Sequence, residues 1–163
     1  MFVAAPIAAS TKTDAYAELA AQARALLQGE RDRTANAANF AALVYHALPG
    51  LNWCGFYFWD GRELVVGPFQ GKPACVRIAL GNGVCGTAAA TRETQVVRDV
   101  DAFPGHIPCD SASRSEIVVP MFAVDGSLIG VWDVDSPELA RFDHEDRVGM
   151  EALVQVFLDA QRA

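Results

Sequence analysis

Two Asp-Gly dipeptides, at positions 60–61 and 125–126, each lie between two runs of apolar residues. Asp-Gly favours the tight turn of a β-hairpin, because that turn needs residues that tolerate a positive φ. The flanking runs, NWCGFYFW and ELVVGPF, then SEIVVPMFAV and LIGVWDV, are rich in β-branched and aromatic residues. The sequence therefore predicts two β-hairpins, with shorter strand-like pieces at ACVRIAL and TQVVRDV.

Both ends of the chain show helical periodicity instead. Residues 14–29 predict a helix with Asp14 as N-cap and Gly29 as its stop, and residues 33–50 predict a second helix that ends in Pro49-Gly50. Residues 143–162 predict a closing helix whose first turn is rich in acid, as the helix dipole favours. We therefore expect an α+β fold in which helices from both ends flank a central, mostly antiparallel β-sheet.

The charge balance argues against a nucleic-acid surface. Lys and Arg total 13 against 20 for Asp and Glu, a formal net charge of −7, whereas surfaces that bind nucleic acid are basic. The apolar opening MFVAAPIAAS lacks the basic flank of a signal peptide and is too short to span a bilayer, and no later run is long enough. We expect a cytoplasmic protein that binds neither nucleic acid nor membrane.

Two carboxylates, Asp133 and Asp135, lie two residues apart in the expected strand VWDVDS. Residues i and i+2 of a strand share a face, so two like charges would lie together unless water, a proton or a cation relieves them. One interpretation is that the strand ends here and leaves both side chains solvated before Ser136-Pro137. The other is a binding site for an ammonium group, and the sequence leaves both open.

An alternation in NWCGFYFW predicts two different strand faces. One face carries Trp53, Gly55, Tyr57 and Trp59, and the other carries Cys54, Phe56 and Phe58. The Phe face is typical of core, and we interpret Cys54 on it as a small buried hydrophobe. The Trp and Tyr face can form the wall of a small-molecule pocket, with Gly55 leaving an opening.

The other three cysteines have several possible roles. Cys75 and Cys85 are separated by ten positions, and Cys109 lies in the loop DAFPGHIPCDSASRSE, which lacks helical and strand periodicity. Durable disulfides are uncommon in a reducing compartment, which leaves packing, metal binding or chemistry. These cysteines and His106 make a nominal zinc set, but zinc sites usually contain a tight cysteine pair, and here only His106 and Cys109 are close in sequence. We therefore expect no metal.

The chain closely resembles the free methionine-(R)-sulfoxide reductase family, small single-domain proteins of the GAF fold, in the motifs GPFQGK, GVCGTAA, PGHIPCD and SEIVVP. Its three cysteines stand at matching separations. The resemblance extends to NWCGFYFW upstream and to LIGVWDVDSPELARFDHED downstream, so it covers nearly everything from about Leu51 to the closing helix. It implies a single GAF domain over residues 1–163, with 1–13 as a flexible N-terminal extension.

The resemblance also implies a reaction and roles for the cysteines. Members of the family reduce free L-methionine-(R)-sulfoxide to methionine. Cys109 matches the position of the attacking thiol, Cys75 matches its disulfide partner, and Cys85 matches a third cysteine that joins thiol exchange or takes the place of the nucleophile. Such a reaction proceeds through a sulfenic acid and a disulfide, which thioredoxin would reduce again without a cofactor.

The substrate-facing positions of the family include four residues already singled out, Trp53, Tyr57, Asp133 and Asp135, and add Glu116. Glu116, Asp133 and Asp135 match acidic positions that face the substrate, where they would bind its ammonium group and supply a proton to the sulfoxide oxygen. Trp53 and Tyr57 match the aromatic wall around its methyl group. Relatives are often homodimers, so we expect a homodimer here as well.

Two rival functions remain open at the level of the sequence. The GAF fold is commonly a binding domain, so a small-molecule sensor without catalysis is the alternative to the reductase. A zinc-binding structural protein is the second rival. Loss of Cys109 distinguishes the first rival, because a sensor would keep its ligand affinity, and metal analysis of the purified chain distinguishes the second.

Overall fold

A computed structural model describes residues 2–106 and 110–162 of the protein. Its centre is a six-stranded β-sheet with the order β3-β2-β1-β6-β5-β4, in which each strand pairs antiparallel to its neighbours. The strands are β1 (Trp53–Trp59), β2 (Leu64–Gly71), β3 (Arg77–Ile78), β4 (Gln95–Val97), β5 (Ser115–Phe122) and β6 (Leu128–Ser136). Both hairpins expected from the Asp-Gly dipeptides are confirmed, since β1 pairs with β2 and β5 with β6.

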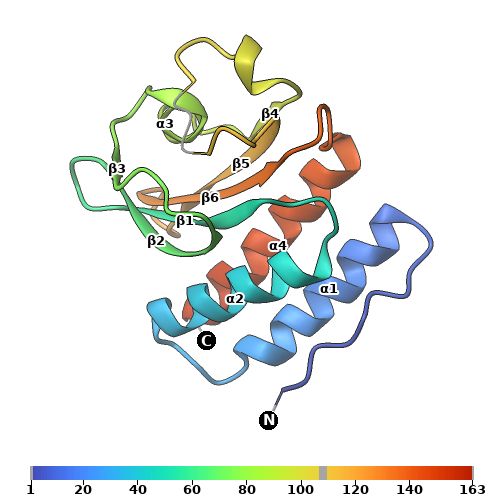
Figure 1. Cartoon of the computed structure of the whole chain (residues 1–163). Coiled ribbons are helices and arrows are strands. Elements are labelled where there is room, and N and C mark those ends of the chain that lie inside the picture. Colours follow the sequence, from blue (N-terminus) through green and yellow to red (C-terminus); the bar gives the residue numbers. More distant parts are fainter. Residues whose placement is uncertain (1, 107–109, 163) are drawn as a thin grey trace.

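Helices cover both faces of this sheet. The helices are α1 (Lys12–Leu27), α2 (Arg33–Ala47), α3 (Gly83–Thr91) and α4 (His144–Arg162), with a 3-10 turn η1 at Val100–Ala102. Figure 1 shows α1, α2 and α4 together on one side and α3 on the other. The expected α+β fold with flanking terminal helices is confirmed. Within the described residues no helix is long and apolar enough to cross a membrane.

The first helix begins earlier than the sequence predicts. Thr11, not Asp14, is the N-cap of α1, and its hydroxyl accepts a hydrogen bond from the backbone N–H of Asp14. The Asp14 carboxylate in turn accepts a hydrogen bond from the Thr11 hydroxyl at 2.8 Å. Asp14 therefore contributes an acidic side chain to the first turn, where the helix dipole favours it.

The main core lies between the sheet and the three helices on its first face. Phe56 from β1 and Trp132 from β6 pack on Phe40 and Phe157, with Phe56 and Phe157 ring centroids 4.5 Å apart. Cys54 lies in the same core, fully buried, and its thiol donates to the carbonyl of Ala41. The prediction that Cys54 is a buried small side chain is confirmed.

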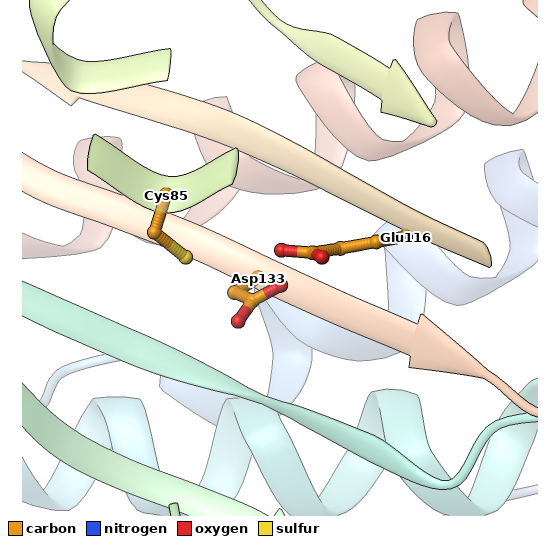
Figure 2. Close-up of side chains that lie close together, drawn as sticks. All are labelled: Cys85, Glu116 and Asp133. Atoms are coloured by element: carbon orange, nitrogen blue, oxygen red, sulfur yellow. The ribbon is translucent and has the colours of Figure 1, made fainter. Parts of the chain in front are cut away.

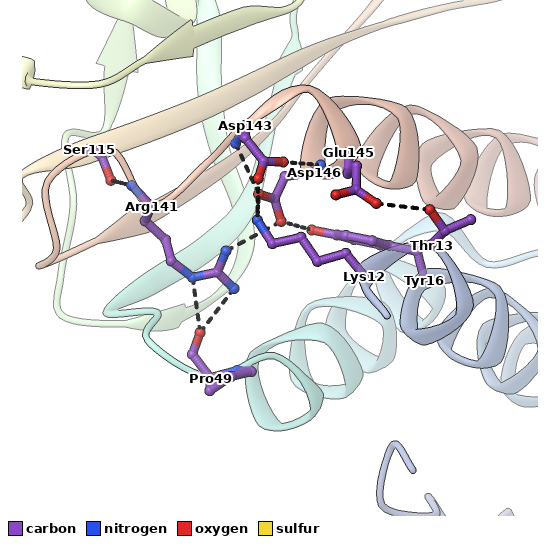
Figure 3. A network of polar contacts seen from close by, with 9 residues as sticks. All are labelled: Lys12, Thr13, Tyr16, Pro49, Ser115, Arg141, Asp143, Glu145 and Asp146. Atoms are coloured by element: carbon purple, nitrogen blue, oxygen red, sulfur yellow. Dashed lines mark hydrogen bonds and ion pairs between the residues drawn. The ribbon is translucent and has the colours of Figure 1, made fainter. Parts of the chain in front are cut away.

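A network of polar side chains joins α1 to the start of α4. Its members are Lys12, Tyr16, Arg141, Asp143 and Asp146, and we call it the junction network (Figure 3). The Arg141 backbone N–H also donates to the Ser115 hydroxyl at 3.3 Å, at the first residue of β5. This network fixes the loop between β6 and α4 to the helical layer.

A second, smaller core lies on the opposite face, beneath α3. Val84 and Ala88 of this helix pack on Tyr57, Val118 and Val131 of the sheet. The sequence patterns did not predict α3. Its glycine at position 86 permits a close approach, since a Cβ there would lie 2.3 Å from the Ala79 carbonyl oxygen. The GVCG segment is therefore the packed first turn of a helix.

Candidate functional site

A pocket opens between α3 and the face of the sheet that α3 covers. Its walls come from β1, β5, β6, the first turn of α3, and residues on both sides of 107–109. The cavity volume is about 30 Å³, and a water molecule needs at least about 10 to 15 Å³ on the same measure. In this conformation the pocket has room for a few atoms and not for an amino acid.

Three carboxyl side chains converge in this pocket. Glu116 on β5 pairs directly with Asp135 on β6, and Asp133 lies two residues along the same strand. Directly opposed and diagonal residues of two strands share a face and contact each other. Their exposed fractions are 6% for Glu116, 6% for Asp133 and 9% for Asp135. We call these three residues the pocket acids.

Burial decides between the two interpretations of the aspartate pair. Strand β6 continues to Ser136, so Asp133 and Asp135 are inside the sheet and not in a turn beyond it. The interpretation in which both side chains are solvated is therefore wrong. The structure instead places them with Glu116, which belongs to a segment 17 residues or more earlier in the chain.

The pocket acids hold protons more tightly than ordinary carboxyls. Burial raises the pKa of Asp133 to about 7. Burial, and then the charge of Asp133, raises the pKa of Glu116 and of Asp135 well above their usual range. The His106 ring lies beside these acids, with its Nε2 3.9 Å from Glu116 Oε2, but burial lowers its pKa and disfavours the charged form. Among the described residues no Lys or Arg pairs with these acids.

Cys85 joins the pocket acids from the other wall. It lies in the first turn of α3, and its sulfur, an oxygen of Glu116 and an oxygen of Asp133 all lie within 4.8 Å of one another. Figure 2 shows the thiol and the two carboxyls pointing toward one another. Burial, and then the charges of Asp133 and Glu116, raises the pKa of the Cys85 thiol. In this state Cys85 is held as a thiol, which is the less nucleophilic form.

The aromatic face of β1 forms the floor beside the acids. Trp53 and Tyr57 are both buried, with ring centroids 5.9 Å apart, and both adjoin Asp133 and Asp135. The opening expected at Gly55 is not present, because Phe69 of β2 fills it: a Cβ at this glycine would lie 2.3 Å from the Phe69 Cβ. The wall is therefore continuous.

The other two cysteines predicted for the site are Cys75 and Cys109. Cys75 lies between β2 and β3, packs against the smaller core and is disulfide-bonded, whereas Cys54 and Cys85 are free. Cys109 lies outside the described residues. Its nearest described neighbours on either side, His106 and Asp110, both line the pocket.

The sequence patterns did not identify two polar residues of the site, Asn52 and Ser113. Ser113 hydrogen-bonds to Asp135 and accepts a hydrogen bond from Asn52 at 3.0 Å. Asn52 also donates to Asp110 at 3.3 Å, and Asp110 lies 3.4 Å from the Lys72 ammonium. Neither Asn52 nor Ser113 belongs to a periodic pattern, so only their positions in the fold reveal them.

Comparisons with known proteins agree with this geometry. The GAF domain family matches residues 15–159. The free methionine-R-sulfoxide reductase of Escherichia coli is 50% identical over 143 residues, which cover 88% of this chain and 86% of that protein. The solved structure of the free methionine-R-sulfoxide reductase of Neisseria meningitidis in complex with its substrate has a TM-score of 0.93 at 46% identity, covering 99% of this chain and 98% of that one.

A solved structure with higher identity carries a different description. It is of a GAF sensor protein from Burkholderia vietnamiensis, with a TM-score of 0.91 at 70% identity, and it covers 94% of this chain and 100% of that chain. The similar proteins therefore include both reductases and a protein described as a GAF sensor.

Proposed function

Because the chain belongs to the GAF domain family and, within it, to the free methionine-R-sulfoxide reductases, we propose that it reduces free L-methionine-(R)-sulfoxide to methionine in the pocket beneath α3. One observation carries the assignment to this pocket: three buried carboxyls face one another without a Lys or Arg partner in the described part of the chain. Uncompensated buried acids are unfavourable unless a ligand or protons relieve them.

The ammonium group of a free amino acid supplies the missing positive charge. When it approaches Asp133 and Asp135, it favours the ionised form of the nearer carboxyl. A methionine sulfoxide inside a polypeptide has no ammonium group, so it would leave the pocket acids without a cation, at a penalty of several kcal/mol. The pocket acids are in this proposal the filter for the free substrate.

The same acids provide the proton that the reaction consumes. The sulfoxide oxygen must be protonated before it leaves sulfur, and a general acid works best with a pKa near the working pH. The pKa of Asp133, raised by burial to about 7, and the raised pKa of Glu116 meet this requirement. Trp53 and Tyr57 are proposed to hold the methyl side of the substrate.

The sulfur chemistry is proposed to begin at Cys109. Its thiolate attacks the sulfoxide sulfur, and the oxygen is transferred with a proton, so that methionine and a cysteine sulfenic acid form. The Cys75 thiol then attacks the sulfenic sulfur, water leaves, and a disulfide results. Cys75 already takes part in a disulfide in the structure, which supports its role as the second thiol. Cys85 is the alternative nucleophile or an exchange partner.

The disulfide state also accounts for the size of the pocket. A cavity of about 30 Å³ cannot admit an amino acid, so the walls must separate before substrate binds. We propose that reduction of the Cys75 disulfide by thioredoxin releases them. We further propose that the enzyme works in the cytoplasm as a homodimer.

The sensor remains the second candidate, supported by the description of the Burkholderia vietnamiensis relative. A sensor and a reductase would both bind a free amino acid at the pocket acids. They differ in sulfur chemistry, because only a reductase needs the cysteines for turnover. Cys109→Ser therefore distinguishes the two functions.

The deciding experiment is a thioredoxin-coupled assay of NADPH oxidation. Free L-methionine-(R)-sulfoxide, its S epimer and a peptide-bound R-sulfoxide are offered to the same preparation. We expect turnover of the free R form alone, complete loss in Cys109→Ser, and unchanged turnover in Cys54→Ser, the matched control in the opposite core. Binding of the free R form without turnover, with thioredoxin shown to be active, would establish the sensor instead.

A further inference from the structure

Three potential metal ligands lie together in the pocket, and a fourth, His106, lies beside one of them, Glu116. We propose that the pocket binds a divalent cation of the zinc class through the sulfur of Cys85 and the carboxylates of Glu116 and Asp133, with His106 as the fourth ligand. This set differs from the sequence-based one, because Cys75 is disulfide-bonded and contributes no thiolate. The ion would be an inhibitor of the site and not a cofactor.

The three inner ligands come from three different elements and converge on one point. Sulfur and both oxygens lie within 4.8 Å of one another, and all three side chains are buried (Figure 2). A tetrahedral zinc ion holds sulfur at about 2.3 Å and oxygen at about 2.1 Å, which separates its ligand atoms by about 3.5 Å. The side chains therefore need to move inward by about 1 Å, which small rotations about their side-chain bonds provide.

A buried oxygen without a partner gives a second, independent indication of a ligand. Asp133 Oδ1 is fully buried and accepts no hydrogen bond from any residue that the structure describes. A buried acceptor left unsatisfied costs free energy of folding, because it has lost its hydrogen bonds to water. A cation bound by the Asp133 carboxylate would provide a partner for this acceptor.

The chemistry of the donor atoms selects the kind of cation. His106 extends the set beyond the carboxyls, since its Nε2 lies 3.9 Å from Glu116 Oε2. A thiolate and an imidazole among four ligands favour zinc or cadmium over magnesium and calcium, which prefer oxygen ligands alone. A cavity of about 30 Å³ fits a single ion and excludes an amino acid.

The ion would occupy the carboxylate of Asp133, one of the two aspartates to which the substrate's ammonium group is proposed to bind. Zinc is therefore expected to compete with the substrate, and this consequence rests on the proposed reductase function. Binding of the ion itself does not depend on that function. The two are tested separately for this reason.

The test uses the disulfide form of the protein and cadmium ions as the probe. In this form the free cysteines that the structure describes are Cys54 and Cys85, and a cadmium–thiolate bond gives a charge-transfer band in the ultraviolet. We expect one cadmium per chain with this band in the unmodified protein and in Cys54→Ser. The band should be lost in Cys85→Ser.

Glu116→Gln serves as the second variant, because it keeps every thiol and most of the side-chain volume. We expect its cadmium affinity to fall by more than about tenfold, since even outer partners of metal ligands contribute roughly 10- to 100-fold to affinity. Circular dichroism establishes that each variant is folded. A band that persists in Cys85→Ser, or an unchanged affinity in folded Glu116→Gln, would overturn the metal site.

A separate turnover assay tests inhibition. With thioredoxin as reductant, zinc should raise the apparent KM for free methionine-(R)-sulfoxide and leave kcat unchanged. If cadmium binds as expected but no sulfoxide is reduced without metal, the proposed function fails and the metal site stands. If turnover is normal and cadmium gives no band, the metal site alone fails.

Discussion

Two buried acidic clusters lie in this small domain, and they are built in opposite ways. Asp146 in the junction network is 1% exposed and accepts hydrogen bonds from Tyr16 at 2.9 Å, Lys12 at 2.6 Å and Arg141 at 3.3 Å (Figure 3). The pocket acids are nearly as buried, yet one oxygen of Asp133 has no partner among the described residues (Figure 2). Asp146 and the pocket acids are similarly buried, but among the described residues only Asp146 has Lys and Arg partners.

The pKa values of Asp143 in the junction network and Asp133 in the pocket shift in opposite directions, and the two residues differ in burial as well as in partner, since the Asp143 side chain is 53% exposed. Hydrogen bonding to Lys12 is the main cause that holds the pKa of Asp143 well below its usual range, whereas burial raises the pKa of Asp133 to about 7. A carboxyl that is paired with a cation stabilises the fold. A carboxyl that is buried without a cation needs a proton or a ligand to offset its charge, and this property makes the pocket the candidate functional site.

The matched pair Asp133→Asn and Asp146→Asn tests this distinction, and the largest effect is expected on catalysis. Asp133→Asn removes a proton donor and an ammonium partner from the pocket, so kcat/KM should fall by about 10²- to 10⁴-fold in the thioredoxin-coupled assay. Its stability at pH 8 should not fall, because the variant removes a buried acid. Turnover within twofold of the unmodified protein would remove Asp133 from the mechanism.

Asp146→Asn should have the opposite profile. The amide replaces an oxygen that accepts hydrogen bonds, which leaves Arg141 without this charged partner and Lys12 with Asp143 alone. Breaking a buried ion pair from one side costs about 3 to 5 kcal/mol, so denaturant unfolding should show a loss of this order. Activity per folded molecule should stay close to normal. A variant that is fully stable but inactive would mean that the two clusters are not separate in function.

The pH dependence of stability should have a different sign for each cluster. Asp133 has a folded-state pKa of about 7 against a usual value of 3.8, so its contribution is fully present below about pH 4 and is lost as the pH rises toward 7. The loss is a few kcal/mol, since each pKa unit is worth about 1.4 kcal/mol. Thermal unfolding in Asp133→Asn should lack this decline between pH 4 and 7.

Asp143 provides the contrast on the acid side. Its pKa is lowered from 3.8, so its contribution is present above about pH 4 and is lost as the pH falls further. Asp143→Asn should therefore flatten the stability curve below pH 4 and leave the range from 4 to 7 unchanged. If Asp133→Asn loses as much stability between pH 4 and 7 as the unmodified protein does, the loss in this pH range does not come from the pocket.

The smallest effect is expected for Lys12→Met. The Lys12 side chain is 38% exposed, and water and salt weaken an ion pair that is open to solvent, so its loss should cost about 1 kcal/mol or less. Arg141 and Tyr16 continue to hold Asp146 in this variant. Chemical unfolding at low and high salt measures the difference. A loss as large as that of Asp146→Asn would show that Lys12 alone compensates the buried acid.

The sheet and the terminal helices were predictable because their signals are local. The Asp-Gly dipeptide at 60–61 and the alternation around Phe56 each specify a hairpin within about twenty residues of chain. Helix α3 was missed because its segment, GVCGTAAAT, has small residues on all sides and no amphipathic pattern. It is a helix because Val84 and Ala88 pack on the sheet, and packing is not a local property.

The kinds of reactive side chain in the site could be predicted from the sequence. The cysteines and the aspartate pair could be singled out from the sequence, and the family resemblance added Glu116 and linked them to one reaction. The role of Cys109 stays a prediction, because it lies outside the described residues. The burial and protonation of the acids could not be predicted from the sequence, since Asp133 and Asp135 were equally compatible with a solvated turn.

The sequence by itself determined the strands, the end helices and the identity of the reactive groups, because periodicity, turn residues and side-chain chemistry are written along the chain. Only the tertiary structure decided which acids are compensated. Pairing of β5 with β6 brings Glu116 to Asp135, and the docking of α3 brings Cys85 to Glu116 and Asp133. The pKa of a carboxyl depends on desolvation and on charges within a few ångströms. Those neighbours come from segments that only folding brings together.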